Sequence, residues 1–331
     1  MAEQQSRRKK FAIICLTLLV LGAGIAWWQR IPLQCWYYAC RMQRAEGDQR
    51  QVWAERLADL GEPALPRLLA CLAKDDEGLC DAARCGLEYL ARTWQPADGR
   101  GRELAQHLFE ENAAFSPAGK AAALELVPAL ISANGPEAAA RLKRFVAAGL
   151  QSAAPVERLA AIGVALRPEV NLLEGVVPLL NDPLPEVRRA AMLALGPVAD
   201  NAEPLVSSDQ LLRWLHDPDP EVQHNCEMAL RCRGLSPRDI RLGRLLTDPD
   251  PVERLSVLIE LPRDDDFALV KWLERLSKDP NSAVRAGAAR VAGERGADFT
   301  ERLEEMSRTD PDSTVRRIAD HYRKLCAEQP H

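Results

Sequence analysis

The dipeptide Asp-Pro recurs along the C-terminal half of this chain at a nearly constant spacing. It begins at Asp182, Asp217, Asp248, Asp279 and Asp310, at intervals of 35, 31, 31 and 31 residues. Self-similarity at one fixed period is typical of repeat proteins, in which each unit buries its apolar face against the next unit. The period therefore predicts a stack of similar units.

The residues around each dipeptide predict two helices joined by a short turn. Proline fixes its own φ and disfavours a helical conformation in the residue before it, so one helix ends at the Asp-Pro. In the first clear unit, Pro185 and Glu186 suit the first turn of a second helix. The N–H groups of that turn have no partner within the helix, so proline loses nothing there, and the positive end of the helix dipole favours an acidic side chain. Val187 and Ala191 then fall on one face of this helix.

The motif Asp-Pro-x-Pro-Glu-Val-Arg-x-x-Ala at 182–191 resembles the HEAT repeat, especially the short bacterial form also seen in phycobilisome-lyase-like proteins. The resemblance is clearest over residues 175–325 and weaker towards the N-terminus. It implies an all-α fold, a HEAT-like α-solenoid (an armadillo-type superhelix) of about eight helical hairpins. We expect this solenoid to occupy residues 48–331, with 48–60 as the second helix of an incomplete capping unit.

The same resemblance implies a ladder of hydrogen bonds between successive repeats. In the HEAT family the ladder joins the Asp of Asp-Pro to the Arg six residues later. This implies contacts of Asp182 with Arg188, Asp279 with Arg285, and Asp310 with Arg316. Gln223 stands where the arginine of its unit would be, so weaker stacking is expected there.

An uncharged apolar stretch near the N-terminus predicts a membrane anchor. Residues 11–28 are 18 consecutive residues without a charge, which is close to the length that spans a bilayer. A basic tail of residues 1–10 precedes the stretch, and Trp27, Trp28, Trp36, Tyr37 and Tyr38 would form an interfacial aromatic belt. The alternative is a cleaved signal peptide, which two Trp residues directly after the cut disfavour. Residues 29–47 would be a juxtamembrane segment.

The distribution of charge predicts the orientation of the anchor and opposes nucleic-acid binding. Four basic residues, Arg7 to Lys10, precede the apolar stretch, and two follow it closely, so the N-terminus is expected in the cytoplasm and the solenoid outside it. From residue 33 onward the chain carries 38 basic and 47 acidic residues, a net charge of −9. Such a body lacks the basic excess that neutralises phosphates, so no nucleic-acid partner is expected.

Five of the nine cysteines lie close to the predicted anchor, and three states are open to them. They are Cys35, Cys40, Cys71, Cys80 and Cys85. Cys35 and Cys40, like Cys80 and Cys85, are five residues apart. On a helix this spacing separates the two Cα atoms too widely for a disulfide within the pair. Free thiols, a bridge between helices such as Cys71 with Cys80, and a zinc site remain the alternatives. Cys15 lies in the apolar stretch, and Cys226 takes the alanine position of its repeat.

The sequence carries no pattern that predicts catalysis, a cofactor or a metal. The histidines are His107, His216, His224, His321 and His331, and none is followed by Glu. The iron-binding His-Glu pairs of the deoxyhypusine hydroxylases, which resemble this architecture, are therefore absent. No Gly-rich phosphate loop or nucleophile elbow is present. We therefore assign no catalytic, cofactor-binding or metal-binding residue.

The combined pattern predicts a non-enzymatic scaffold or adaptor, anchored in a membrane by residues 11–28, that binds one or more proteins. Repeat solenoids present an extended concave surface that suits such partners. An alternative of another class is an enzyme or cofactor-handling protein on a HEAT scaffold, comparable to a bilin lyase. A nucleic-acid-binding protein comparable to the HEAT-like DNA glycosylases is a third reading, which the acidic body and the anchor oppose.

Overall fold

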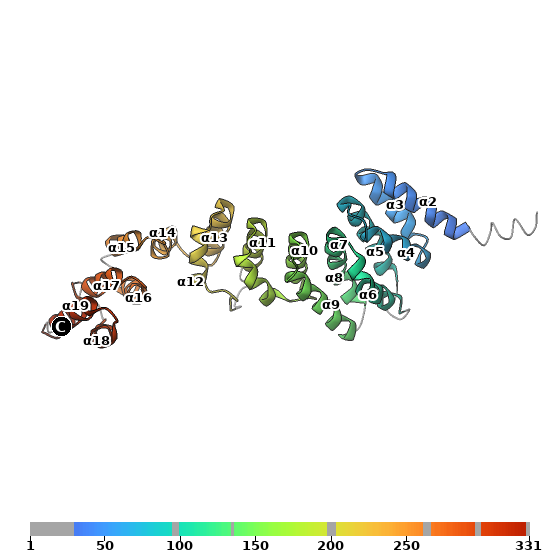
Figure 1. Ribbon diagram of the computed structural model, residues 1–331. Helices are drawn as coiled ribbons and strands as arrows, with labels where there is room; N and C mark the ends of the chain where they lie inside the picture. Colours follow the sequence, from blue (N-terminus) through green and yellow to red (C-terminus); the bar gives the residue numbers. More distant parts are fainter. Residues whose placement is uncertain are drawn as a thin grey trace, which may run out of the picture. The chain divides into compact units, whose positions relative to one another are not determined.

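The computed structural model describes residues 30–94, 99–133, 136–196, 203–260, 266–294 and 299–328, and their regular structure is entirely helical (Figure 1). The chain divides into two compact units, residues 1–194 (unit 1) and 195–331 (unit 2). The predicted tail of residues 1–10 and anchor of residues 11–28 lie outside the described residues, as do Cys15 and His331. Within those described ranges, no helix is both long and apolar enough to cross a membrane.

Unit 1 is a succession of helical pairs. The elements are α2 (Arg30–Arg44), α3 (Asp48–Ala58), η1 (Glu62–Ala64), α4 (Leu65–Leu72), α5 (Glu77–Thr93), α6 (Arg100–Glu111), η3 (Asn112–Ala114), α7 (Pro117–Glu125), α8 (Val127–Ala133), α9 (Pro136–Leu150), α10 (Pro155–Ala165), η4 (Leu173–Asn181) and α11 (Pro185–Leu195). The second helices α3, α5, α7 and α10 pack one on the next. Their contact faces carry leucines that are almost fully buried, among them Leu57, Leu87 and Leu124.

The first helical pair is complete, which corrects the prediction of half a capping unit. Helix α2 occupies the predicted juxtamembrane segment and packs against α3 and α4. Cys35, Ala39 and Met42 are buried at spacings of four and three residues, which is one face of a helix. In the described residues the helical array therefore includes α2, from residue 30, and is not limited to residues 48 onward.

Unit 2 repeats the same arrangement. Its elements are α12 (Ser208–Leu211), η5 (Leu212–His216), α13 (Pro220–Cys232), α14 (Pro237–Leu246), α15 (Pro251–Glu260), α16 (Asp266–Leu276), α17 (Ser282–Glu294), α18 (Thr300–Thr309) and α19 (Ser313–Glu328). Helices α15, α17 and α19 pack one on the next. One hydrophobic cluster runs through α14 to α19, with Leu273, Val284 and Val315 fully buried.

Each Asp-Pro folds the turn between two helices, as the sequence predicts. The Asp279 carboxylate accepts the backbone N–H of Asn281 at 2.8 Å, and the Asn281 side chain accepts that of Ala283 at 2.9 Å. The first bond closes an Asx turn, and the second caps the start of the second helix. Asp310 and Asp312 repeat the arrangement one unit later. These local hydrogen bonds explain why the dipeptide marks the period.

The predicted contact of the arginine with its own Asp-Pro is present for Arg188, Arg285 and Arg316, through the backbone carbonyl of the Asp, and Arg285 also reaches the next unit. The Arg285 Nη1 donates to the backbone carbonyls of Asp279 and Pro280, at 2.9 and 3.1 Å. Its Nε and Nη2 donate to the carboxylate of Asp310 in the next unit, at 2.8 and 2.9 Å. The arginine thus contacts the main chain of its own Asp-Pro, and it pairs with the carboxylate that begins the following unit.

The same contact recurs in both units, and it includes arginines that the sequence analysis did not assign. The ion pairs of this kind are Arg50–Asp76, Arg158–Asp182, Arg254–Asp279 and Arg285–Asp310. Except for Asp76, these side chains are at most 18% exposed. The ladder therefore consists of charged groups that are largely removed from water and paired with an opposite charge, as buried charges require.

Unit 2 contains one position at which this ion pair is replaced. Gln223 keeps the main-chain contact, because its Nε2 donates to the Asp217 carbonyl at 2.7 Å. The carboxylate that an arginine would meet there is Asp248, which instead lies beside His216, with Nδ1 and Oδ2 3.9 Å apart. A long contact to histidine is weaker than a two-point arginine pair. This agrees with the weaker stacking predicted for that repeat.

Replacing Gln223 with arginine is expected to stabilise unit 2. The new guanidinium would reach Asp248 as Arg254 reaches Asp279, and hydrogen bonds to a charged group contribute about 1–3 kcal/mol. Urea unfolding, followed with a spectroscopic probe placed in unit 2, would measure the gain in the free energy of unfolding. The gain should disappear when Asp248→Ala is added. Comparing the two single variants with the double variant isolates the interaction between residues 223 and 248. A gain of equal size in the Asp248→Ala background would contradict the assignment.

Candidate functional site

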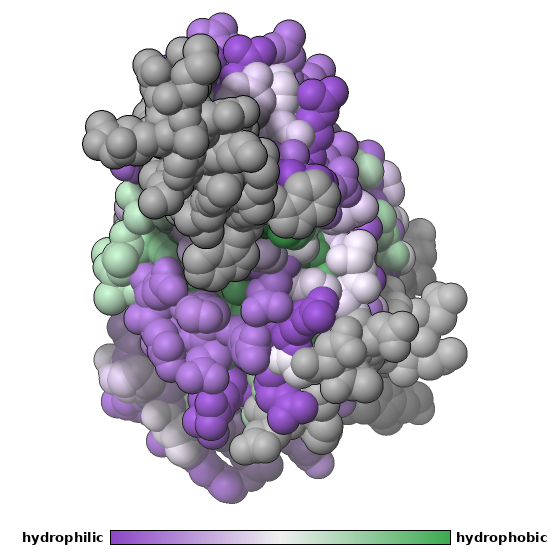
Figure 2. Space-filling model, turned by 90° about the vertical axis from the view of Figure 1, so that its right-hand side faces the viewer, coloured by the Kyte–Doolittle hydropathy of each residue, from purple (hydrophilic) through white to green (hydrophobic). Residues whose placement is uncertain are grey.

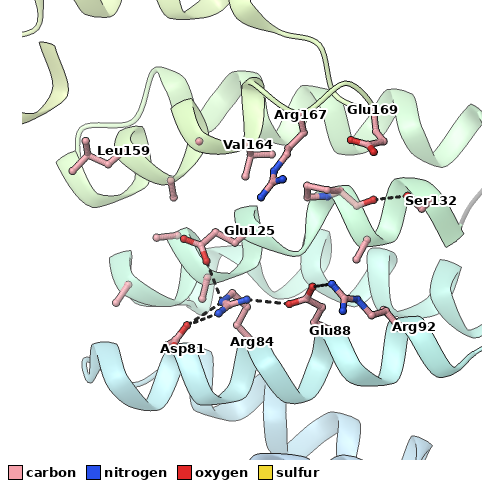
Figure 3. A pocket seen from close by; sticks show the side chains of 18 of the residues that line it. Asp81, Arg84, Glu88, Arg92, Glu125, Ser132, Leu159, Val164, Arg167 and Glu169 are labelled. Carbon is pink, nitrogen blue, oxygen red and sulfur yellow. Dashed lines mark hydrogen bonds and ion pairs between the residues drawn. The ribbon is translucent and has the colours of Figure 1, made fainter. Parts of the chain in front are cut away.

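Unit 1 has a groove of about 1110 Å³ on the face formed by its second helices (Figure 3). Helices α5, α7, α8 and α10 supply most of its lining. Because these helices lie side by side, each presents one stripe of side chains to the same hollow. The lining comprises Glu77, Asp81, Arg84, Glu88, Ala91, Arg92, Trp94, Ala118, Ala121, Ala122, Glu125, Pro128, Ala129, Ser132, Val156, Leu159, Ala160, Gly163, Val164, Arg167 and Glu169.

Arg84 is the centre of a charge network in this groove. Its guanidinium contacts Asp81 at 2.7 Å and Glu88 at 3.1 Å on its own helix, and Glu125 of α7 at 3.0 Å (Figure 3). Burial by itself lowers the pKa of Arg84, but the Asp81 hydrogen bond and the neighbouring charges of Asp81 and Glu125 raise it overall. Arg84 therefore remains a fixed cation that joins α5 to α7.

The middle of the groove is made of small side chains. Ala118, Ala121 and Ala122 come from α7, and Ala160 and Gly163 come from α10. A Cβ atom added at Gly163 would have no heavy atom within 4 Å, so the hollow is open at that point. Small residues allow another polypeptide backbone to approach closely.

The charges of the groove favour a cationic ligand. Its lining includes five carboxylates, on Glu77, Asp81, Glu88, Glu125 and Glu169, and three guanidiniums, on Arg84, Arg92 and Arg167. The residues that line it in the described part of the chain include no histidine or cysteine. The groups that are present can form ion pairs and apolar contacts, which is the chemistry of recognition.

Unit 2 has a second, smaller groove of about 580 Å³ on the face formed by α15, α17 and α19. Leu255, Ala286 and Ile318 are half-buried against the core beneath it. Its other lining residues are Ala283, Gly287, Arg290, Thr314, Arg317, His321 and Tyr322. Both grooves therefore lie on second helices, at equivalent places in the two units.

The histidines lie apart from one another in the described residues. His107 contacts Glu111 at 3.1 Å on the surface of α6, and His216 lies within hydrogen-bonding distance of the Arg244 carbonyl, at 2.7 Å. His224 is exposed, and His321 lies in the unit 2 groove beside Tyr322. In the described ranges, no three His, Cys, Asp or Glu side chains lie where they could hold a metal ion together.

The eight cysteines in the described residues are free thiols. Cys35 and Cys40 lie within α2, and Cys80 and Cys85 lie within α5, so neither pair has disulfide geometry, as the helical spacing predicts. The Cys80 thiol donates to the Cys71 carbonyl at 3.6 Å. Burial raises the pKa of Cys71 to about 11, which keeps this thiol protonated at neutral pH.

Cys226 is buried at the alanine position of its repeat, as predicted. Its thiol donates to the Leu211 carbonyl at 3.1 Å, and burial raises its pKa to about 12. Like Cys71, it is a packing residue and not a reactive thiol.

Sequence reasoning missed the groove of unit 1. Arg84 and Glu125 are 41 positions apart, and the repeats that contain them lack the Asp-Pro signal. The available sign was the run of small residues at one helical spacing, Ala118, Ala121 and Ala122, followed by Ala160 and Gly163 in the next second helix.

Comparison with known proteins locates the repeat family in unit 2. A family model of HEAT repeats matches residues 239–321. A crystal structure of the Escherichia coli protein YibA is similar over 86% of this chain and 98% of that chain, with 14% identity and a TM-score of 0.42. A search of curated proteins gave no significant match. Residues 239–321 of this chain therefore match HEAT repeats, in keeping with the helical structure of the described residues there.

Proposed function

We propose that this protein is a scaffold or adaptor that binds a segment of a partner protein in the groove of unit 1. The observation that carries the proposal is the hollow of about 1110 Å³ lined by successive second helices, with small residues in its middle and charged residues around them. A helix or an extended segment of a partner fits such a surface, because small residues admit its backbone and carboxylates receive its basic side chains.

The partner segment is expected to be cationic. Glu88 and Glu125 already share Arg84, whereas Glu77 and Glu169 line the groove without an arginine partner among the described ion pairs. Basic side chains of the partner would meet these two carboxylates. Complementary charges of this kind speed association and exclude wrong partners more than they raise affinity.

The proposal includes attachment to a membrane through residues 11–28, with the N-terminus in the cytoplasm and the solenoid outside it. The support is the uncharged stretch that follows Arg7 to Lys10. Helix α2, which comes directly after it, also leaves large apolar side chains exposed, namely Ile31, Leu33, Trp36 and Tyr37. Aromatic side chains with basic neighbours suit the boundary between lipid and water.

The surface of unit 1 on the side of α2 combines hydrophilic residues with smaller groups of hydrophobic ones (Figure 2). Helix α2 itself contains no acidic residue and has Arg41 and Arg44 in its last turn. This local charge favours an anionic membrane surface, although the body as a whole is acidic.

Filling the groove tests the binding proposal. Gly163→Trp places an indole in open space, so it should block the groove without disturbing the fold. A photoreactive side chain at Ala160, in the full-length protein within its own membranes, should form an adduct with a partner protein, and Gly163→Trp should abolish that adduct. Ile259→Trp adds similar bulk at a position that is 84% exposed and should leave the adduct intact. An adduct that persists in Gly163→Trp would contradict the proposal.

The orientation has its own test. A single cysteine placed after His331, in a variant without the native cysteines, should react with a membrane-impermeant thiol reagent in intact cells. Labelling only after the cells are broken would place the solenoid in the cytoplasm.

A further inference from the structure

The groove of unit 2 differs from that of unit 1 in the sign of its charge. Its lining contains Arg290, Arg317 and His321, and no aspartate or glutamate. Residues 195–331 carry 26 Asp and Glu and 20 Lys and Arg, a net charge of −6. The groove is therefore a cationic hollow in an acidic unit.

The two arginines are available to a ligand in different degrees. Arg290 contacts Glu294 one turn later on α17, at 3.6 Å, and both side chains are more than half exposed. Glu294 also accepts a hydrogen bond from the Tyr322 hydroxyl at 3.2 Å, so one carboxylate lies at the edge of the groove. Arg317 is exposed and has no ion-pair partner within the described ranges. One guanidinium is thus unneutralised, and the other is held only by a solvent-exposed pair, which contributes little.

Apolar groups line the same hollow as these cations. Leu255, Ala286, Ile318 and Tyr322 are partly exposed in the hollow and partly packed on the core beneath it. A Cβ atom added at Gly287 would come within 2.9 Å of Leu255 and Leu258 side-chain atoms, so the glycine lets α17 pack closely against these leucines of α15. The site can receive one apolar side chain, with acidic groups on either side of it.

We propose that the groove formed by α15, α17 and α19 is a second binding site, whose ligand is an acidic segment of a partner protein with an apolar anchor residue. The carboxylates of the segment pair with Arg290 and Arg317, and the anchor packs on Leu255, Ile318 and Tyr322. The inference rests on charge complementarity within unit 2 and does not depend on the groove of unit 1.

Selection from a random peptide library on the purified full-length protein tests the site. Peptides rich in Asp and Glu with one or two apolar residues should be recovered, and added salt should weaken their binding. The double variant Arg290→Glu with Arg317→Glu should reduce their affinity about tenfold or more, because two attractive contacts become repulsive. Lys278→Glu with Arg308→Glu, an equal change of charge at exposed ion pairs outside the groove, should have little effect.

The outcomes separate this inference from the proposed function. Acidic peptides that bind Arg290→Glu/Arg317→Glu as tightly as the unaltered protein would overturn the inference. The same conclusion would follow if this variant lost binding only to anionic lipid vesicles or to single-stranded DNA. Basic peptides that are lost in Gly163→Trp and retained in Arg290→Glu/Arg317→Glu report on unit 1 alone, so either site can fail without the other.

Discussion

Replacing Gly119 with alanine is expected to destabilise unit 1 by at least about 3 kcal/mol, beyond the usual cost of one extra methyl group in a packed interior. An added Cβ would lie 1.8 Å from the Leu72 carbonyl oxygen and 2.7 Å from its carbonyl carbon. These are main-chain atoms at the end of α4, so no rotation of a side chain relieves the overlap. Either α7 or α4 must move.

The close approach exists because one residue caps two helices. The Ser116 hydroxyl accepts the Gly119 N–H at 3.0 Å and so caps the start of α7. The Ser116 N–H and hydroxyl also donate to the Leu72 carbonyl, at 3.1 and 3.2 Å, at the end of α4. This arrangement brings the first turn of α7 against the last turn of α4, which leaves no space for a side chain at Gly119.

Gly163→Ala is the matched control, because it is the same substitution in another second helix of the same unit. Its added methyl group meets nothing within 4 Å. Alanine favours a helix over glycine by about 1 kcal/mol, so this variant should be slightly more stable than the unaltered protein. Thermal unfolding monitored by circular dichroism distinguishes the Gly119→Ala variant from the Gly163→Ala variant. Hydrogen exchange would then show that the loss of stability in Gly119→Ala lies in α4 and α7. Equal stability of the two variants would contradict the packing described here.

Arg285→Ala is expected to cost unit 2 about 3–5 kcal/mol, the range found when one partner of a buried ion pair is removed. The side chains of Arg285 and Asp310 are 10% and 5% exposed, so the substitution leaves an almost buried carboxylate without its cation. It also removes the donors that satisfy the carbonyls of Asp279 and Pro280. Arg290→Ala, on the same helix, removes only an exposed pair and should change stability by less than about 1 kcal/mol.

Acid should reduce the difference between Arg285→Ala and the unaltered protein. The hydrogen bond from Arg285 is the main reason that the pKa of Asp310 lies below its ordinary value. A carboxylate whose pKa is lowered by folding adds stability that is complete above its unfolded pKa of about 4 and is lost as the pH falls through the folded value. Urea unfolding at several pH values below about 5 should therefore show the two curves converging. A difference that stays constant down to low pH would mean that the loss comes from packing alone.

Local patterns in the sequence were sufficient to predict the repeat and its turns. The break at each Asp-Pro, the start of α11 at Pro185 and the buried place of Cys226 depend on dihedral restriction, capping and helical spacing, all of which act within about ten residues. The contact of Arg285 with its own Asp-Pro belongs to the same class, because it spans six residues.

The sequence of α2 contains two local patterns that predict different surroundings for this helix. The spacing of Cys35, Ala39 and Met42 indicates a packed helix face, but the aromatic residues beside it suggested a membrane interface instead. Helix α2 buries one face on α3 and α4 and leaves Trp36 and Tyr37 exposed.

The sequence by itself determined the helical repeat, the positions of its turns and the family that it resembles, because these follow from interactions between near neighbours along the chain. Only the tertiary structure decided which Asp each Arg meets across a repeat, that Arg84 joins Glu125, and that Gly119 is enclosed where Gly163 is open. Those features depend on which helices stack side by side, and stacking joins residues 25 or more positions apart, a distance over which sequence spacing carries no geometric information.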